Sequence, residues 1–575
     1  MMQSQRSRSK IVRRAMNGTL AGNLDPVLLR VYAARGIGST DELNLDLREL
    51  LPVSSLDGIA AAVDLLVDAR ARQRRVLVIG DFDADGATST ALLVRGLRRL
   101  GFAEVGYLVP DRFRFGYGLT PEIVALAAER APQLIITVDN GMSSDAGVAA
   151  ARGRGIDVLI TDHHLPGATL PEANAICNPN LAGARFPSKA LAGVGVAFYV
   201  LAALTRRLAD ERAGAILPSP ADLLDLVALG TVADVVPFDR NNRILVAQGL
   251  KRIRAGRCVA GIQALLAEGG RRLERVVASD LGFAAGPRLN AAGRLDDMSL
   301  GIECLLADDP AHARLLAMQL GQLNTERRAI EQRMNENAAA IVQRMQLDTD
   351  DLALGLCLFD ADWHQGVVGL VAARAKERLH RPVIAFAPAE EPWLRGSARS
   401  VPGVHMRDVL DAVAKRQPGL LEKFGGHAMA AGLTLHRERL EEFRALFATE
   451  VARHMNREDT EGIVASDGAL APGEITLATA HTLRDGGPWG QGFPEPVFDG
   501  EFAVLEARTV GERHLKLKLR SGGDTPVLDA IAFNFVRHGR ESIPRSAEVL
   551  QLAYRLDVNE YLGLERLQLV VEQLC

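Results

Sequence analysis

Along residues 76–161, short apolar runs alternate with segments in which hydrophobic residues recur at helical spacing. Short apolar runs predict buried β-strands at Val76–Gly80, Val105–Val109, Leu134–Val138 and Val158–Thr161. Between these strands, Pro121–Ala128 and Ala146–Arg152 show the spacing of amphipathic helices. Strands that alternate with helices in this way predict an α/β domain with a mostly parallel sheet.

The pattern changes on both sides of this segment. Residues 15–70 predict a small helical cap, with amphipathic stretches at Pro26–Ala34 and Leu56–Ala71. The stretch Pro310–Met345 is rich in charged residues, Gln and Ala, and only Gly321 interrupts it. As one helix it would extend about 50 Å. A helix that is polar around its whole circumference is typical of a bridge between domains.

The C-terminal part of the chain predicts two further units. Residues 352–455 begin a second α/β unit, with strands expected at Leu354–Phe359 and Pro382–Ala387. Short strands separated by turns follow at Phe502–Ala507, His514–Leu519, Val527–Phe535 and Gln568–Val571. Their even spacing within residues 462–575 predicts a small β-barrel.

Three aspartates follow the first strand at every second position: Asp81, Asp83 and Asp85. The apolar run Ala91–Leu100 then predicts a helix. Like charges this close raise each other's pKa, so the cluster favours a cation, and hard oxygen donors favour Mg²⁺ or Mn²⁺. A metal-free loop of solvated aspartates is an alternative. An EF-hand calcium loop also begins D-x-D-x-D-G, but its twelfth position requires Glu, where this chain has Leu92.

Aspartate and histidine residues also follow two later predicted strands and one predicted helix. Leu134–Val138 runs into Asp139-Asn140-Gly141, and Val158–Ile160 runs into Thr161-Asp162-His163-His164. A helical segment near Leu223–Leu229 leads into Asp234. Ligands of open α/β sheets bind at the carboxyl ends of the strands. We therefore expect these groups, on successive loops of one sheet face, to converge on one site.

Composition adds limits to this picture. A chain of 575 residues predicts three or four domains. The net charge of −4 gives no global basic signature, so any nucleic-acid surface must be local. Aromatic residues make up only 5%, which argues against extensive base-stacking platforms. Five scattered cysteines, the absence of a secretory signal pattern and the absence of a long apolar run predict a cytoplasmic protein without disulfides or a zinc site.

Several short motifs together resemble one family. GDFDADG (80–86), VDNG (138–141), TDHH (161–164) and GTVADVVP (230–237) resemble the DHH phosphoesterases. GPRLNAAGRLDD (286–297) and FGGHAMAAGL (424–433) narrow the resemblance to the bacterial DHH exonucleases that act on single-stranded DNA. It extends from about residue 11 to the end. One departure is PWGQGFPEPVF (488–498), where the family reads closer to PFGxGNPEPxF.

The resemblance implies an α/β fold in five parts. They are an N-terminal helical cap (1–72), a parallel-sheet DHH catalytic domain (73–306), a connecting helix (307–349), a smaller α/β DHHA1 substrate-binding domain (350–458) and an OB-like, nucleic-acid-binding barrel (459–575). The implied activity is 5′→3′ removal of mononucleotides from single-stranded DNA, with Mn²⁺ or Mg²⁺, in recombination and in DNA repair that includes mismatch repair. The implied partners are a single-stranded-DNA-binding protein and a RecQ-type helicase.

Phosphodiester hydrolysis needs a water placed in line and a stabilised leaving oxygen, and two cations provide both. We assign six candidate metal ligands: Asp81, Asp83, Asp85, Asp139, His163 and Asp234. Asp139 and Asp234 are the candidates for a ligand shared by two ions, and the nitrogen of His163 shifts the preference toward Mn²⁺. Three roles are open for His164. It could bind the transferred phosphate, protonate the leaving oxygen, or donate a hydrogen bond that orients a metal ligand without binding the metal itself. Asp162 would orient the histidines.

Donors for the substrate phosphates are expected first near the metal cluster. Arg112 follows a strand end and is a candidate catalytic residue, with an ordinary surface arginine as the alternative. Three further candidate phosphate donors are Arg288, Asn290 and Arg294. Because Pro and Gly bound their segment, we do not expect it to form a regular charged helix.

Further phosphate donors are expected in the DHHA1 unit. Gly396, Ser397 and Arg399 predict a nest of exposed backbone N–H groups that, facing the metals, would bind the terminal 5′ phosphate. Gly425, Gly426 and His427 predict a similar tight loop, although a lone core histidine is the alternative for His427. His364 is interpreted as a cap of the helix that follows it.

Two alternatives remain open at the level of sequence. One is a DHH hydrolase of pyrophosphate, cyclic dinucleotides or short oligonucleotides, which would not need the barrel. The other is a non-catalytic DHH scaffold that binds replication proteins. Such a scaffold should lack metal ligands, whereas every acidic position and His163 are present here.

Overall fold

The computed structural model describes residues 10–574 except 17, 112–113, 116–117, 168, 212–215, 349–351, 512, 524, 536–542 and 562. The chain forms two compact units. The first unit contains residues 16–324 and 478–496. The second unit contains the chain up to residue 15 and residues 325–477 and 497–575.

The first unit is built on a five-stranded parallel sheet with the order β3-β2-β4-β5-β6. Its strands are β2 (Val76–Gly80), β3 (Val105–Leu108), β4 (Leu134–Val138), β5 (Asp157–Thr161) and β6 (Ala175–Cys177). The four strands predicted from the apolar runs are confirmed, with ends that differ by a residue at most. The three-residue β6 is too short to give a periodic signal.

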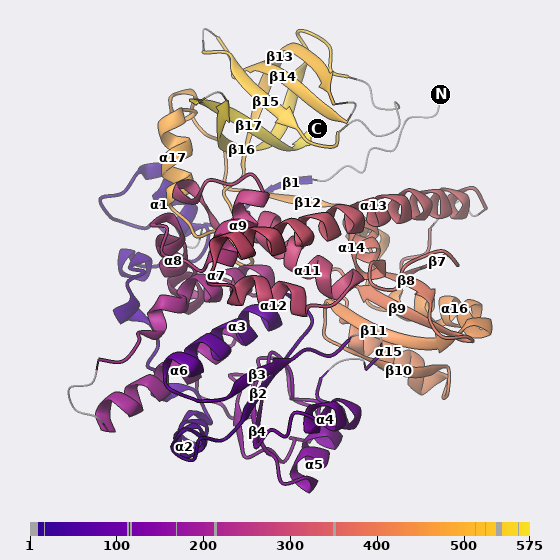
Figure 1. The fold of residues 1–575 in the computed structure, drawn as a ribbon. Helices are drawn as coiled ribbons and strands as arrows, with labels where there is room; N and C mark the ends of the chain where they lie inside the picture. The colour runs from indigo at the N-terminus through magenta and orange to yellow at the C-terminus, as the bar shows by residue number, and fades with distance from the viewer. Residues whose placement is uncertain are drawn as a thin grey trace. The chain divides into compact units, whose positions relative to one another are not determined.

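Helices cover both faces of this sheet (Figure 1). On one face, α4 (Pro121–Ala128) and α5 (Asp145–Gly153) pack Ile123 and Val148 against the strands in one apolar cluster. The other face is covered by α2 (Ile59–Ala71), α3 (Ala84–Arg99) and α6 (Gly193–Glu211). Helix α3 corresponds to the helix predicted at Ala91–Leu100, but it begins seven residues earlier, at Ala84.

The remaining helices of the first unit surround this core. They are α1 (Pro26–Ala33), α7 (Leu224–Ala233), α8 (Arg240–Arg254), α9 (Ala260–Glu268), α10 (Ala278–Asp280), α11 (Gly286–Leu295), α12 (Ser299–Leu306) and α17 (Leu477–Asp485). Short 3₁₀ turns lie at Thr40–Leu43, Leu47–Glu49, Val53–Ser55, Pro220–Leu223 and Leu273–Arg275, and one π-helical turn, η6, spans Leu281–Ala285.

Residues 478–496 precede the barrel strands and belong to the first unit by their contacts, although the predicted domain of 459–575 includes them. The Tyr32 hydroxyl of α1 donates to the Gly486 carbonyl over 2.7 Å, and the Tyr32 and Trp489 rings lie 5.9 Å apart. Arg243 of α8 stacks on Phe493, with its guanidinium carbon 4.4 Å from the ring centre. These contacts fix the PWGQGFPEP segment in the first unit.

Helix α13 (Pro310–Asp348) confirms the long helix predicted at Pro310–Met345. It begins in the first unit and continues into the second. None of the described helices alone is long and apolar enough to span a membrane; one sharply bent pair, Leu47–Ser55 with Ile59–Ala71, meets that test only in combination.

The second unit contains a five-stranded sheet with the order β10-β11-β9-β8-β7. The strands are β7 (Leu356–Phe359), β8 (Val383–Pro388), β9 (Trp393–Arg399), β10 (Leu421–Gly426) and β11 (Ala430–His436), covered by α14 (Val368–Leu379), α15 (Met406–Arg416) and α16 (Leu440–Val451). Only β7 and β8 are parallel. The sequence predicted these two strands and missed the antiparallel strands β9, β10 and β11, each of which contains glycine and was not predicted as a strand.

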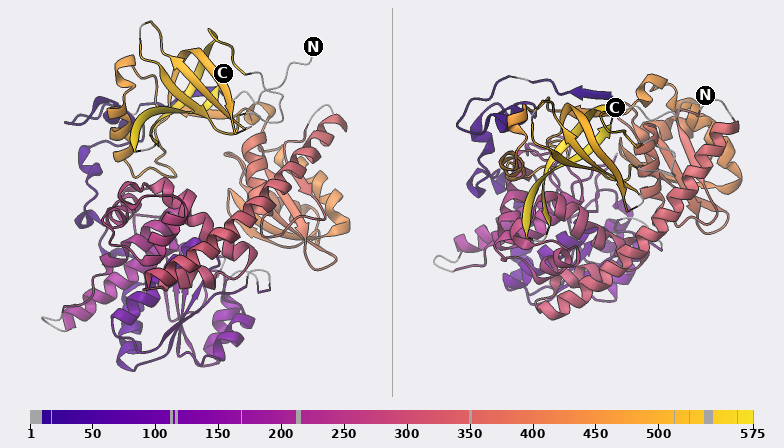
Figure 2. Two further views of the ribbon diagram at one scale, coloured as in Figure 1. Left: turned by 45° about the horizontal axis from the view of Figure 1, so that its top comes forward. Right: turned by 90° about the horizontal axis from the view of Figure 1, so that it is seen from above.

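A closed barrel completes the second unit (Figure 2). Its strands are β13 (Phe498–Val510), β14 (His514–Arg520), β15 (Leu528–Ala532), β17 (Leu564–Leu574) and β16 (Val549–Tyr561), in that order around the barrel. The predicted barrel is confirmed, although β16 was missed.

The N-terminal strand belongs to the second unit, contrary to the predicted cap of 1–72. Strand β1 (Lys10–Arg13) pairs in parallel with β12 (Ile463–Ser466). The Arg13 guanidinium then donates to both carboxylate oxygens of Asp499 at the start of β13. The described part of the cap, beyond residue 15, consists of α1, α2 and 3₁₀ turns.

Candidate metal centre

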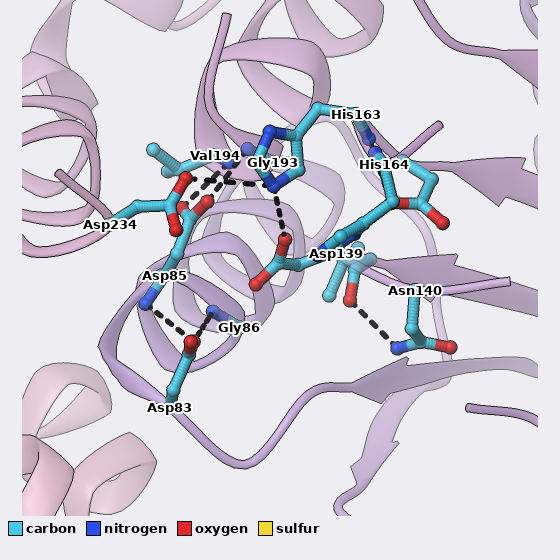
Figure 3. Close-up of polar contacts among 12 residues, drawn as sticks. Asp83, Asp85, Gly86, Asp139, Asn140, His163, His164, Gly193, Val194 and Asp234 are labelled. Carbon is cyan, nitrogen blue, oxygen red and sulfur yellow. Dashed lines mark hydrogen bonds and ion pairs between the residues drawn. The ribbon is translucent and has the colours of Figure 1, made fainter. Parts of the chain in front are cut away.

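The predicted acidic cluster and histidine pair meet at the carboxyl end of the parallel sheet (Figure 3). Asp81 and Asp83 follow β2, Asp139 follows β4, and His163 follows β5. Two ligand candidates come from helices instead of the expected loops. Asp85 lies in the first turn of α3, and Asp234 is the residue that ends α7.

Asp83 and Asp85 shape the start of α3. The Asp83 carboxylate accepts hydrogen bonds from the backbone N–H groups of Asp85 and Gly86, both over 3.0 Å. This is an N-cap, and it explains why the helix begins before its apolar run. Asp85 in turn accepts from the N–H groups of Gly193 (2.7 Å) and Val194 (2.9 Å), so its negative charge lies at the N-terminus of α6.

Asp139 is held in an unusual backbone conformation. Its φ is +60°, the left-handed region that most side chains avoid. The side chain of Asn140 fixes the turn by donating to the carbonyls of Ile79 (3.1 Å) and Val138 (2.9 Å). This strand-end turn directs the buried Asp139 carboxylate toward the other ligand candidates (Figure 3).

The His163 imidazole points between two carboxylates (Figure 3). Its Nε2 lies 3.1 Å from Asp139 Oδ1 and 3.5 Å from Asp234 Oδ2. Burial, followed by the charge of His164, lowers the His163 pKa, so the neutral ring forms no ion pair with them. Nε2 also makes no hydrogen bond of regular geometry, and neither does the buried Asp234 Oδ2. Such convergent, unsatisfied donor atoms fit a bound cation.

The donor atoms form overlapping groups, two of which together use all six predicted ligands. Asp85, His163 and Asp234 offer one group within 4.8 Å, and Asp81, Asp83 and Asp139 offer another. Asp139 and His163 also approach a ring nitrogen of His164 within that distance. Two such groups match the ligand requirement of two ions.

The pKa values of these carboxylates also fit a site for a cation. Burial, together with neighbouring carboxylates, raises the pKa of Asp85 and of Asp234 to about 7. Burial and the charge of Asp85 raise the pKa of Asp139 well above its usual value. Carboxylates in this state bind a divalent cation with release of protons.

His164 is held differently from His163. Its Nδ1 lies 2.8 Å from Asp162 Oδ1, and Asp162 also accepts from the Met142 N–H over 3.0 Å. Burial opposes ionisation of His164, but the bond and charge of Asp162 outweigh it and raise the pKa to about 9. The Asn178 amide donates to the His164 carbonyl over 2.8 Å. His164 is therefore a positioned cation beside the ligand set, and Asp162 is its orienting group.

The predicted phosphate donors of the first unit belong to a regular helix, contrary to expectation. Arg288, Asn290 and Arg294 all lie in α11. Arg288 donates to the carbonyls of Ala284 (2.7 Å) and Glu268 (3.0 Å), and Asn290 Oδ1 accepts from the Ala84 N–H over 2.9 Å. In this structure the two side chains brace α11 against its surroundings. Arg112 lies outside the described residues.

In the second unit, the predicted phosphate nest is wrong as a backbone motif. Gly396 and Ser397 lie in β9, which pairs with β8 on one side and β11 on the other, so their backbone groups belong to the sheet. The Ser397 and Arg399 side chains do meet, because Arg399 Nη1 donates to Ser397 Oγ over 3.1 Å. A β-carbon at Gly369 in α14 would stand 3.0 Å from both Ser397 Oγ and Arg399 Nη2. The two side chains therefore lie against the first turn of α14.

The remaining predicted residues of the second unit lie in the β10–β11 hairpin and in the turn before α14. Gly425 and Gly426 end β10, and the His427 N–H donates to the Ala430 carbonyl over 2.8 Å in the hairpin to β11. Gly425 and Gly426 pair with Gly432 and Ala431 of β11, so the predicted tight loop is wrong for these two residues. His427 lies in the hairpin turn and is exposed, so it is not a core histidine. His364 Nδ1 accepts from the Gly366 N–H over 3.1 Å, in the turn before α14 and not on the helix itself.

Sequence reasoning missed the start of α6. Gly193 and Val194 hold Asp85, and a β-carbon at Gly193 would stand 2.7 Å from Asp139 Oδ1. The only signal was a pair of glycines, Gly193 and Gly195, that open an apolar helical run. Nothing in that pattern specifies a contact with a carboxylate 108 residues away.

Family comparisons agree with this geometry. Residues 75–231 match the family model described as "DHH family, N-terminal domain", residues 340–453 match "DHHA1 domain", and residues 466–573 match "RecJ OB domain". The first match covers the parallel sheet with the metal centre, the second covers the mixed sheet, and the third covers the barrel.

Similar proteins extend the match to almost the whole chain. The single-stranded-DNA-specific exonuclease RecJ of Dickeya dadantii is 55% identical, over 96% of this chain and 97% of its own. RecJ of Escherichia coli is 52% identical over 96% of each chain. The crystal structure of Thermus thermophilus RecJ in complex with Mn²⁺ matches with a TM-score of 0.79 and 32% identity, over 96% of this chain and 76% of that one. The chain therefore belongs to the RecJ family, within the DHH superfamily.

Proposed function

We propose that this chain is a single-stranded-DNA-specific 5′→3′ exonuclease that hydrolyses phosphodiester bonds and releases 5′-mononucleotides. The observation that carries the proposal is the pair of donor groups, Asp85–His163–Asp234 and Asp81–Asp83–Asp139, at the carboxyl end of the parallel sheet. Relatives of 50–55% identity are single-stranded-DNA-specific exonucleases.

The metal ions are Mn²⁺ or Mg²⁺, both of which occur in crystal structures of the Thermus thermophilus relative. Bound ions supply a nucleophilic water at neutral pH and stabilise charge on the phosphoryl oxygens. The protein's own part is to fix the ligands. The α6 N-terminus and the Asn140 turn hold Asp85 and Asp139, and neutral His163 offers a nitrogen lone pair.

His164 is proposed to act on the phosphate or the leaving oxygen. The charge and hydrogen bond of Asp162 keep its ring protonated at neutral pH. A protonated imidazole can donate a hydrogen bond to a phosphoryl oxygen or a proton to the departing one. Arg112 keeps its proposed role as a further phosphate donor.

The barrel is proposed to bind the single strand. Along β14, Leu515, Leu517 and Leu519 point into the core, and the positions between them carry Lys516 and Lys518. Arg508 of β13 pairs in register with Lys516 and extends this row of basic side chains, while Glu506 lies 3.3 Å from Lys518 and 3.8 Å from Arg508 and offsets part of their charge. Local positive charge of this kind binds the DNA backbone even though the whole chain is slightly acidic.

The 5′ end is proposed to be read by Ser397 and Arg399. Their side chains lie together against the first turn of α14, where a helix N-terminus adds positive potential. The proposed hydrogen-bond donors to the 5′ phosphate are therefore these two side chains and not the backbone N–H groups predicted from the sequence. Gly425, Gly426, His427 and Arg294 remain proposed substrate contacts.

Two alternative functions are less well supported. A hydrolase of pyrophosphate, cyclic dinucleotides or short oligonucleotides would not need the barrel with its basic strand. A non-catalytic scaffold would not need six converging ligands.

Further proposals concern the setting in which the enzyme works. They are a role in recombination and in DNA repair that includes mismatch repair, a cytoplasmic location, and cooperation with a single-stranded-DNA-binding protein and a RecQ-type helicase. The helicase would supply single strands. Four free cysteines among the described residues suit a reducing compartment. Faster degradation of a duplex when the helicase is added, and no change with a helicase that lacks ATPase activity, would support the partnership.

The function is tested by a substrate panel with Mn²⁺: 5′-labelled single-stranded DNA, the same strand in a blunt duplex, pyrophosphate and a cyclic dinucleotide. We expect mononucleotides from the single strand alone. Preferential hydrolysis of either small substrate, or equal rates on the duplex, would contradict the proposal.

A further inference from the structure

Phe283 is an unusually exposed aromatic residue in the unit that carries the metal centre. Its side chain is 74% exposed. Among the described residues only one other Phe, Tyr or Trp is exposed, Phe533 beside the barrel strand β15. Phe is among the residues most often fully buried in folded proteins, so a phenylalanine ring with this exposure is uncommon.

The local backbone turns this ring outward. Phe283 lies at the centre of η6, and single π turns often mark functional sites. Its neighbours Leu281, Ala284 and Ala285 are buried. The Arg288 guanidinium donates to the Ala284 carbonyl and to Glu268 of α9, so the turn is braced from the buried side.

The same turn lies against the helix that supplies a metal ligand. A β-carbon at Gly282 would stand 3.2 Å from Val232 Cγ1, and one at Gly286 would stand 3.2 Å from Ala233 Cβ. Val232 and Ala233 form the last turn of α7, which ends at Asp234. η6 therefore packs beside the residue that immediately precedes this ligand.

Helix α11, which continues this turn, contacts the start of α3 between two other ligand candidates. Asn290, seven residues after Phe283, accepts from the Ala84 N–H, between Asp83 and Asp85. Seven helical residues correspond to roughly 10 Å along the axis. At about 3.4 Å for each stacked nucleotide of a strand, this is the length of a few nucleotides.

We propose that Phe283 is a stacking platform for one nucleobase of the single-stranded DNA substrate, a few nucleotides from the scissile bond. The inference rests on the proposed function. An unpaired base offers a free π face to an aromatic ring, whereas the bases of a duplex are already stacked on both sides. The contact thus selects single strands without reading sequence, and Phe283 is a specificity-determining residue.

The test is an abasic scan. A set of 5′-phosphorylated oligonucleotides carries one abasic residue at each of the first eight positions, and KM is measured for the wild type and for Phe283→Ala. In the wild type, an abasic residue at one position should raise KM roughly five- to a hundred-fold. In Phe283→Ala, KM for the intact strand should rise by a similar factor, and the abasic residue at that position should have no further effect.

Control variants separate stacking from apolar contact and from folding. Phe283→Trp should restore the position-specific effect, and Phe283→Leu should not. Ile216→Ala removes a fully exposed apolar side chain from the same unit and should keep the wild-type pattern.

An abasic penalty that is equally large in Phe283→Ala and in the wild type would overturn the inference, and so would full rescue by Phe283→Leu. Activity of the wild type on the intact strand tests the proposed function separately, so failure of one proposal is distinguishable from failure of the other.

Discussion

Gly193 lies so close to Asp139 that a β-carbon at position 193 would stand 2.7 Å from both Cβ and Oδ1 of the aspartate. The same glycine donates its N–H to Asp85 over 2.7 Å. One backbone position therefore supports a ligand candidate in each of the two donor groups.

Gly193→Ala should displace Asp139 and weaken metal binding. An added methyl group in a filled site typically costs about 1–3 kcal/mol, and loss of support behind a ligand typically weakens metal affinity about 10- to 100-fold. Titration of Mn²⁺ binding by calorimetry measures the effect. Gly153→Ala, at a helical glycine with open space around its β-position, is the matched control and should bind Mn²⁺ like the wild type. Equal affinities for Gly193→Ala and the control would refute the supporting role.

Metal binding should stabilise the first unit more at high pH than at low pH. Asp85 and Asp234 have folded-state pKa values of about 7, above the ordinary value of 3.8. Between these values the unfolded chain ionises first, so the stability of the metal-free protein falls as pH rises from about 4 to about 7. A divalent cation removes this penalty.

The measurement for this prediction is Tm with Mn²⁺ and with chelator at pH 5.5 and pH 8. The Tm gain should be larger at pH 8, and calorimetry in buffers of different ionisation enthalpy should show proton release. A gain that is independent of pH would mean that these carboxylates are not the ligands.

Arg399→Ala should reduce the preference for 5′-phosphorylated ends. A charge-assisted hydrogen bond contributes about 1.5–3 kcal/mol, or roughly ten- to a hundred-fold in kcat/KM. The comparison is kcat/KM on 5′-phosphate and 5′-hydroxyl strands. Lys415→Ala, a salt-bridged surface cation of the same unit, is the control. If both substrates lose activity equally, Arg399 is a general backbone contact and not a reader of the 5′ phosphate.

The sequence predicted the elements that carry strong periodic signals. β2 and β4 are uninterrupted apolar runs and α13 is a long helical pattern, and the barrel was predicted from the spacing of its strands. The candidate ligands were found because carboxylates at the ends of parallel strands must share one edge of the sheet. Their convergence, including Asp234, is confirmed, whereas which ligand joins two ions stays a prediction.

The errors have local physical causes. The start of α3 contains Asp, Gly and Thr, which weaken a helical signal, and the cap of Asp83 on Gly86 is invisible without coordinates. The strand β9 was predicted as a loop because Gly396, at its centre, has no side chain to continue the alternation of apolar and polar residues. A β-carbon there would stand 2.5 Å from the Phe386 ring, so tertiary packing explains this glycine. Contacts between distant segments, such as Gly193 with Asp85, leave no pattern in the local sequence.

The central claim is that Asp139 belongs to a metal centre that hydrolyses single-stranded DNA. The most direct measurement is release of 5′-mononucleotides from 5′-phosphorylated single-stranded DNA with saturating Mn²⁺, by the wild type and by Asp139→Ala, with folding checked by circular dichroism. Asp145→Ala, which replaces an exposed aspartate six residues away, is the control. We predict mononucleotides from the wild type and the control, no product with chelator, and a loss of at least about a thousandfold in Asp139→Ala. Near-wild-type turnover by Asp139→Ala, or undiminished hydrolysis in excess chelator, would contradict the account.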